Sequence, residues 1–220
     1  MTPTLQDICP MTWSKSALIE VFQRELPGIS AHDMVMGYVR PSVPEVLRTK
    51  REVRTSSVVF LIYPKNGTWH FLLLKRHDYA GVHSGQVGLP GGSLEQGESR
   101  EGAAIRELHE ETGLRLEEKD LLTSLSPLYI SPSNFIVYPF MALIEEEPTW
   151  IFDEREVKKG IEVPLKDLVV HDNLRESQVK MSGSAMRIQV KSFPFGGEVV
   201  WGATAMILSE CKQIMLNLGE

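Results

Sequence analysis

Apolar residues recur along this chain of 220 residues with two periods, one typical of helices and one typical of strands. Residues 13–26 carry apolar side chains every three or four positions, which predicts an amphipathic helix that ends at the Pro-Gly pair after it. Residues 27–55 contain several prolines and a charged run from Arg48 to Arg54, a pattern typical of a solvated connector. We therefore expect residues 1–55 to form a helix and connector arm.

The pattern changes at Ser56, where runs of β-branched, aromatic and leucine residues begin. Two such runs, 56–63 and 69–75, flank a Pro-Lys-Asn-Gly-Thr turn and predict a hairpin. A glycine-rich loop over residues 81–98 follows. It leads into a predicted helix from about Ser99 to Thr112, which the next glycine closes.

The rest of the chain predicts further strands and a closing helix over residues 203–218. The expected strands cover residues 124–130, 135–144, 160–163, 185–191 and 197–201. Because strands and helices do not alternate one for one, a mixed sheet flanked by helices is favoured over a doubly wound parallel sheet. We expect residues 56–220 to form this one domain.

Composition and charge exclude several classes of function. The net charge is −6 and the sequence pI is near 5.6, which argues against a nucleic acid as the main partner because no basic face is available. The chain has no apolar run of about 18 residues and no basic leader before an apolar stretch, so we expect neither a membrane span nor secretion. The two cysteines, Cys9 and Cys211, form no CxxC pair, which fits the cytoplasm as the expected location.

The predicted helix 99–112 places three acids on one face. At 100° per residue, Glu107, Glu110 and Glu111 fall within an arc of about 100°, away from the apolar stripe. Like charges at this spacing destabilise an exposed helix by roughly 0.2–0.5 kcal/mol per pair. The acids are therefore either a solvated acidic face or the ligands of a cation.

The surroundings of these acids favour a cation. The glycine-rich loop can bring bare backbone close to them, and Glu98 and Arg106 can form an ion pair that fixes this loop on the helix. Carboxylate and carbonyl oxygens are the ligands that Mg²⁺ and Mn²⁺ prefer. The pattern therefore predicts metal-dependent hydrolysis of a phosphoanhydride. A GxxxxGK[ST] loop and a GxSxG elbow are absent, and His109-Glu110 lacks the second histidine of HExxH.

The order Gly92, Glu98 and then Arg-Glu-Leu-His-Glu-Glu-Thr-Gly-Leu from Arg106 to Leu114 resembles the complete signature of the Nudix hydrolases. The resemblance implies an α/β/α sandwich with a mixed sheet that cleaves nucleoside diphosphate derivatives. It also assigns roles to individual residues. Glu107 and Glu111 are the main metal ligands. Glu110 is a further ligand and is counted among the catalytic residues, and the Gly91 carbonyl is an extra ligand. Glu98 and Arg106 orient these ligands.

A second stretch, Leu72 to Gly92, is similar to the loop motif of the coenzyme A diphosphatase branch of that family. The similarity implies hydrolysis of coenzyme A or acyl-CoA, with Arg76, His83 and Gln86 in contact with the substrate. His83 could instead only cap the loop. Gly81 stands where the branch has a second arginine, and this departure favours another nucleotide substrate, such as NADH, ADP-ribose or an oxidised nucleoside triphosphate.

Three expectations come from the same resemblance. A carboxylate outside the signature often completes such sites, and Glu156 is the candidate, with Glu154 next. A homodimer is implied. The resemblance also leaves a different class open, a catalytically silent nucleotide sensor, but such a protein would be expected to lose signature acids or to carry a basic DNA-binding domain, and this chain does neither.

Overall fold

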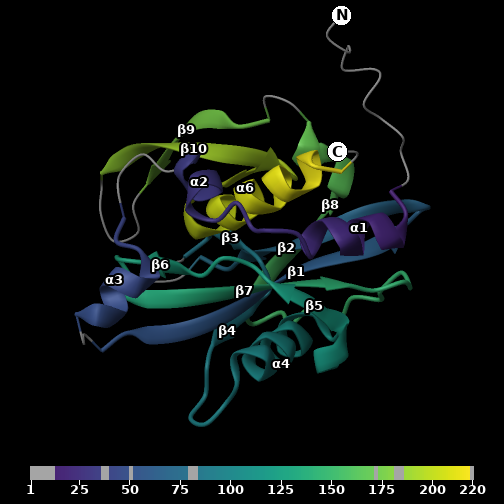
Figure 1. Cartoon of the computed structure of the whole chain (residues 1–220), viewed down its shortest axis with the longest axis horizontal. Coiled ribbons are helices and arrows are strands. Elements are labelled where there is room, and N and C mark those ends of the chain that lie inside the picture. Colours follow the sequence, from purple (N-terminus) through teal and green to yellow (C-terminus); the bar gives the residue numbers. More distant parts are fainter. Residues whose placement is uncertain are drawn as a thin grey trace, which may run out of the picture.

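A computed structural model of the chain describes residues 13–35, 40–49, 52–78, 84–170, 173–180 and 186–218. Its centre is a mixed sheet with helices on both faces (Figure 1). The helices α1 (Lys15–Phe22), α2 (Ile29–Asp33) and α6 (Gly202–Leu216) cover one face, and α4 (Arg100–Thr112) covers the other. The expected layers of helix, sheet and helix are confirmed.

The central sheet has the order β3-β2-β1-β7-β5, with β4 paired to β1, β6 to β7 and β8 to β2. Strand β1 runs parallel to β7 and antiparallel to β2 and β4, so the sheet is mixed as expected. The strand bounds are β1 Arg54–Lys65, β2 Thr68–Arg76, β3 Val87–Gly88, β4 Gly91–Ser93, β5 Leu121–Ser124, β6 Leu128–Ile130, β7 Phe135–Leu143 and β8 Val157–Pro164.

The predicted hairpin joins β1 and β2 through Asn66 and Gly67. Both residues have positive φ angles, 49° and 73°. An Asn-Gly pair adopts these angles readily, and such a turn matches the twist of the flanking strands. This turn fixes the pairing of Lys65 with Thr68 and of Ile62 with Phe71.

Alternate residues of β1 build two separate cores. Phe60 and Ile62 belong to the larger cluster, which includes residues of α1 and α6. Val59 and Leu61 belong to the other cluster, which includes Ala104 and Leu108 of α4. A strand that is buried on both faces has a continuous run of apolar residues and no polar alternation, which explains the apolar sequence of β1.

The segment expected to be a solvated connector is instead partly helical and partly buried. Helix α2 buries Ala31 and His32, and α3 (Val43–Arg48) buries Val43 and Val46. A capping box between Ser42 and Glu45 starts α3. The division of the chain at residue 55 stays a prediction.

A second, three-stranded sheet lies on the α6 side of the molecule (Figure 1). It contains β9 (Arg175–Lys180), β10 (Arg187–Phe195) and β11 (Glu198–Val200). Strand β9 was not expected, because its exposed polar residues give no alternation that marks a strand. The expected strand 124–130 is interrupted, since β5 and β6 pair with different parts of β7.

Two short elements complete the description: the 3₁₀ helix η1 (Glu118–Asp120) and the helix α5 (Leu165–Val169). Among the helices described, none has the length and apolar character required to cross a bilayer. Cys211 is a buried free thiol, whereas Cys9 falls outside the described residues.

Candidate active site

Helix α4 holds the acids of the signature, and both of its ends are capped, the second by the glycine that the sequence predicts. The Ser99 hydroxyl accepts a hydrogen bond from Gly102 N at 2.9 Å. At the other end Gly113 adopts a left-handed conformation with φ 74°, and its N–H donates to the His109 carbonyl at 2.8 Å. Because Ala103, Ala104 and Leu108 are buried against the sheet, the rotation of the helix about its axis is fixed.

Glu111 is the most deeply placed of the three acids, with only 4% of its surface exposed. Its Oε2 accepts a hydrogen bond from Gly91 N at 2.8 Å, and its Oε1 lies 3.4 Å from an Arg76 guanidinium nitrogen. Burial raises the pKa of Glu111 to about 7, and the nearby charges of Glu107 and Glu156 add to this rise. Arg76 and the Gly91 N–H oppose it.

Glu107 lies against the backbone of β4. A Cβ atom on Gly92 would stand 2.4 Å from the carboxylate of Glu107, so only glycine leaves room for this carboxylate. Burial raises the pKa of Glu107, although the hydrogen bond from Arg106 lowers it. The expected close approach of bare backbone to the acids is confirmed at this position.

Arg106 connects the helix to the loop before it. Its Nε donates to Glu98 Oε1 at 2.8 Å, and one terminal nitrogen donates to the Ser93 carbonyl at 3.0 Å. The other terminal nitrogen donates to Glu107 and Glu110, both at 3.0 Å. The predicted pair of Glu98 and Arg106 is thus present, and the hydrogen bonds from Arg106 lower the pKa of Glu98. The carboxylates in turn raise the pKa of Arg106.

Glu110 differs from its neighbours because its side chain is more than half exposed. Its described contact is with Arg106, four residues earlier on the same helix. The helix therefore presents two acids toward β4 and one toward solvent.

Gly91, the residue before Gly92 on β4, contacts Glu111 through its backbone. Its φ of 146° is a conformation that other residues rarely adopt, and a Cβ atom would stand 2.2 Å from the Ser57 carbonyl. Its N–H donates to Glu111, and its carbonyl accepts from Arg76 at 3.3 Å. The carbonyl predicted as a ligand thus lies at the cluster. Its role as a ligand stays a prediction.

The loop that carries Glu156 is fixed to the C-terminal end of α4. Ile151 N donates to the Thr112 carbonyl at 2.9 Å, and Asp153 N donates to the Glu111 carbonyl at 3.2 Å. The charge of Glu156 contributes to the raised pKa of both Glu107 and Glu111, after the larger effect of their burial. The choice of Glu156 over Glu154 as the acid that completes the site stays a prediction.

Two of the three residues expected to contact the substrate lie beside each other. Arg76 ends β2 near Glu111, and its backbone N–H donates to the Gln86 carbonyl at 3.0 Å. His83 and Gly81 lie outside the described residues. The contact of Arg76 with Glu111 was not expected, because 35 residues separate the two in the chain.

The sequence also gave no signal for a stack at the start of α4. The Arg100 guanidinium lies 3.6 Å from the centre of the Tyr138 ring. Such cation–π contacts depend on how α4 packs on β7, which the local pattern does not encode. The stack places a cation and an aromatic ring on the face of the sheet that carries the acids.

The donor atoms at this site fit a hard divalent cation. A buried and a partly buried carboxylate with raised pKa values, an exposed carboxylate and a glycine carbonyl make up the site, and such oxygen atoms are the ligands that Mg²⁺ and Mn²⁺ prefer. Within the described ranges, no group of three His, Cys, Asp or Glu side chains already has the geometry of a metal site. Arg76 and Arg106 hold the acids instead.

Comparisons with known proteins agree with this geometry. A family model described as NUDIX domain matches residues 53–182. "Nudix hydrolase 15, mitochondrial" of Arabidopsis thaliana is 29% identical over 166 residues, which are 73% of this chain and 58% of that protein. "Uncharacterized Nudix hydrolase NudL" of Yersinia enterocolitica is 30% identical over 143 residues, 64% of this chain and 72% of that one.

A solved structure shares the fold. The MutT/nudix family protein from Enterococcus faecalis superposes with a TM-score of 0.53, covering 95% of this chain and 81% of that chain at 16% identity. At this identity the likeness concerns the architecture alone.

Proposed function

Because this chain belongs to the Nudix family, we propose that it hydrolyses the diphosphate linkage of a nucleoside diphosphate derivative. The observation that carries the proposal is the buried carboxylate of Glu111, whose pKa is raised among other acids beside a glycine backbone. Such buried charge is costly unless something compensates it. A phosphate-bound divalent cation is a suitable compensating group.

We assign the metal to Glu107 and Glu111, with Glu110 and the Gly91 carbonyl as further ligands. When bound, Mg²⁺ or Mn²⁺ would neutralise phosphate charge and favour ionisation of a water molecule at neutral pH. In the net reaction one water is consumed. Its oxygen forms a bond to one phosphorus, and the bridging P–O bond breaks to give two phosphate monoesters.

The other residues of the site position these acids and move a proton. The bonds from Arg106 to Glu98 and Ser93 hold the loop at the helix, so we assign Glu98 and Arg106 an orienting role. The exposed carboxylate of Glu156, whose charge contributes to the raised pKa of Glu111, is our candidate to accept the proton of the attacking water. Replacing Glu156 with Gln should then lower kcat by about 10²–10⁴-fold. Metal affinity should be largely retained, and Glu154→Gln is the control.

We further propose coenzyme A or an acyl-CoA as the substrate, with 3′,5′-ADP and (acyl-)4′-phosphopantetheine as products. The resemblance of Leu72–Gly92 to the coenzyme A diphosphatase loop motif supports this choice, and so does the position of Arg76 beside Glu111. An arginine at this point can bind two oxygens of a phosphate group through two parallel hydrogen bonds.

The test is a substrate panel with purified protein and Mg²⁺ or Mn²⁺. The protein is incubated in ¹⁸O-labelled water with one of five compounds: coenzyme A, octanoyl-CoA, NADH, ADP-ribose or an oxidised nucleoside triphosphate. Mass spectrometry measures the masses of the products. We expect 4′-phosphopantetheine or its acyl form, and the label shows which phosphorus took up oxygen. If only another member of the panel is cleaved, the coenzyme A assignment fails. If no member of the panel is cleaved, the proposal that the protein hydrolyses a diphosphate linkage fails as well.

The alternative substrates have one specific observation in their favour. Gly81 stands at the position where the resembling branch has its second arginine, so a clamp for the 3′-phosphate of coenzyme A is missing there. NADH, ADP-ribose and an oxidised nucleoside triphosphate do not need that clamp. A higher kcat/KM for one of these compounds than for coenzyme A would favour this second function.

A further inference from the structure

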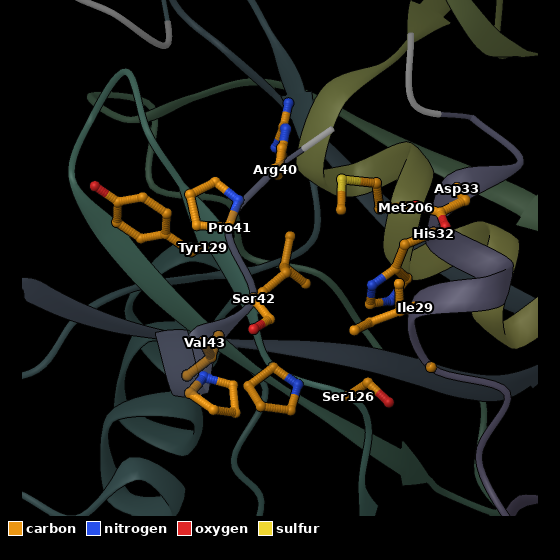
Figure 2. Close-up of a pocket in the computed structure, with 14 residues that line it drawn as sticks. Ile29, His32, Asp33, Arg40, Pro41, Ser42, Val43, Ser126, Tyr129 and Met206 are labelled. Carbon is orange, nitrogen blue, oxygen red and sulfur yellow. The ribbon is translucent and has the colours of Figure 1, made fainter. Parts of the chain in front are cut away.

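A cavity of about 670 Å³ lies between α2, the start of α3, the segment Ser126–Tyr129 and α6. In Figure 2, Tyr129 and Pro41 lie on one side of it, and Ile29, His32 and Met206 lie on the other. Its volume falls in the range of about 300–1,000 Å³ that is typical of small-molecule sites. The acids of the candidate active site do not line this cavity, so it is a separate feature of the surface.

A buried carboxylate fixes the walls of the cavity. Glu210 of α6 has no exposed surface. Its Oε1 accepts from Gly28 N at 3.2 Å, its Oε2 accepts from Ser126 N at 3.2 Å, and the same Oε2 lies 3.4 Å from His32 Nε2. These contacts join three distant parts of the chain at one point. They hold α2 and the segment that starts at Ser126 against α6 on one side of the cavity.

Most of the cavity wall lies outside the part of the chain that matches the NUDIX domain model. The lining residues from 28–33 and 40–44 precede the matched region 53–182, and Met206 follows it. The matched region contributes Ser126–Tyr129 only. The flanking segments thus build a pocket onto the domain, which suits a role in selecting the substrate.

The register of the sheet relates the cavity to the acids. Tyr129 on β6 pairs with Ile136 on β7, which pairs with Thr55 on β1, and the Thr55 carbonyl accepts from Leu94 N just after β4. With neighbouring strands about 4.8 Å apart, the three steps from Tyr129 to Leu94 span about 14 Å, and Gly92 and Gly91 beside the acids lie two and three residues further along β4. An extended group attached to a diphosphate at β4 can cover such a distance.

The lining determines which group the cavity would accept. Its walls are mostly aliphatic, with Ile29, Val43, Leu128 and Met206 among them, together with prolines. His32, Asp33, Arg40 and Ser42 add polar groups to part of this wall. An apolar chain that lies against the aliphatic part would be removed from water, and the flexible thioether of Met206 can adapt to it.

Building on the proposed function, we propose that this cavity binds the acyl chain of an acyl-CoA and makes the enzyme selective for such thioesters. The diphosphate would lie at the acids of α4 and β4, and the acyl end would lie between α2 and Tyr129. This assigns a role in specificity to the segment before residue 53.

Blocking the cavity tests the proposal. Ile29 is 60% exposed at the rim of the cavity, so Ile29→Trp adds bulk there with little cost to packing. Leu216→Trp is the matched control, because Leu216 is 46% exposed on the same helix as Met206 but ten residues away. Ten residues of helix separate the two positions by about 15 Å. Melting temperatures show whether each variant is folded.

We expect the ratio of kcat/KM for octanoyl-CoA to that for coenzyme A to fall at least about tenfold in Ile29→Trp. The ratio should stay at the wild-type value in Leu216→Trp. A ratio that is the same in wild type, Ile29→Trp and Leu216→Trp would overturn the proposal.

A binding experiment separates this proposal from the proposed hydrolysis. S-octanoyl-pantetheine, which has neither diphosphate nor nucleotide, is titrated calorimetrically into metal-free protein. We expect it to bind the wild type and to bind Ile29→Trp at least about tenfold more weakly. Absence of binding to the wild type would overturn the cavity assignment even if coenzyme A is hydrolysed. Binding without any hydrolysis would support the cavity and refute the proposed function.

Discussion

The Glu111 carboxylate is held by one backbone N–H and one guanidinium group in a place where little water reaches it. Its pKa of about 7 means that the protein alone stabilises the charged form poorly at neutral pH. A divalent cation would reverse this balance. The residue is thus better suited to bind a cation than to stabilise the metal-free fold.

This gives a first prediction, on metal binding. Replacing Glu111 with Gln removes a charge and keeps the size of the side chain, so Mn²⁺ affinity measured by calorimetry should fall at least about tenfold. Glu101→Gln is the matched control, since Glu101 is an exposed acid in the first turn of the same helix. Equal Mn²⁺ affinity in both variants and the wild type would contradict the ligand assignment.

A second prediction concerns the pH dependence of stability without metal. The pKa of Glu111 is about 7 in the folded protein, above its ordinary value of 4.5, so the folded state binds more protons than the unfolded state between these values. The free energy of unfolding should therefore fall as pH rises from 4.5 to 7, by up to about 3 kcal/mol from this group. Urea unfolding in EDTA at pH 5, 6 and 7.5 measures this.

The Glu111→Gln variant is the control for that experiment, because Gln does not titrate. Its unfolding free energy should depend less on pH over the same window, and at pH 7.5 without metal it should melt at an equal or higher temperature than the wild type. A marked loss of stability in this variant would mean that the carboxylate mainly stabilises the fold.

The third prediction concerns Gly92, where a substitution should weaken metal binding and leave the stability of the fold nearly unchanged. Adding a methyl group here would displace the flexible end of Glu107, while the backbone of Gly92 needs no left-handed conformation. In Gly92→Ala, Mn²⁺ affinity should drop severalfold with a change of less than about 1 kcal/mol in unfolding free energy. In Gly91→Ala the Cβ would meet backbone atoms, so a large loss of stability is expected as the contrast.

Among the elements, the contact between α4 and the loop before it depends on Arg106. The guanidinium donates to the loop through Glu98 and Ser93, and to the helix through Glu107 and Glu110. One side chain thus fixes both the distance between loop and helix and the placement of two acids. The geometry of the site follows from this connection.

The fourth prediction tests this connection. Arg106→Ala should lower the unfolding free energy by about 2 kcal/mol, because it leaves the partly buried carboxylate of Glu98 without its charged donor. Arg155→Ala is the control, because the Arg155 side chain is 88% exposed and its ion pair with Asp153 should contribute much less to stability. A double-mutant cycle with Glu98→Gln measures the coupling, which additive effects would refute.

The strands also show why elements with a regular pattern were predicted and others were missed. The continuous apolar runs of β1 and β2 identify strands that are buried on both faces. Strand β9 has mostly exposed polar residues, and its place is set by pairing with β10. Helices α2 and α3 are too short for a repeating apolar stripe.

For the whole molecule, the N-terminal segment contributes to the main core. Leu18, Val21 and Phe22 of α1 belong to the same cluster as Phe60 of β1 and Ile207 of α6. The N-terminal helix is therefore packed into the core. This packing brings α2 and the start of α3 to the cavity beside α6.

The fifth prediction measures what this packing contributes. Phe22→Ala removes a fully buried ring that lies 6.1 Å from the Phe60 ring, so the unfolding free energy should fall by about 3–5 kcal/mol. Leu47→Ala, at an exposed position of α3, should change it by less than about 0.5 kcal/mol. Similar small values for both would mean that residues 1–55 contribute little to the stability of the domain.

The sequence alone determined the features that depend on neighbouring residues. These are the hairpin turn at Asn66 and Gly67, the caps of α4 and the acid stripe along that helix, because helical and turn geometry fix residues a few positions apart. The pairing of Glu98 with Arg106 also belongs here, since only the N-cap and the first turns of α4 separate them.

Only the tertiary structure decided which distant groups meet. The contact of Arg76 with Glu111, the stack of Arg100 on Tyr138 and the position of Glu156 follow from how β2, β7 and the loop before β8 pack around α4. Glu210 meets Gly28 and Ser126 across separations of 182 and 84 residues. Such contacts depend on the register of the sheet and the packing of both cores, which a local pattern does not specify.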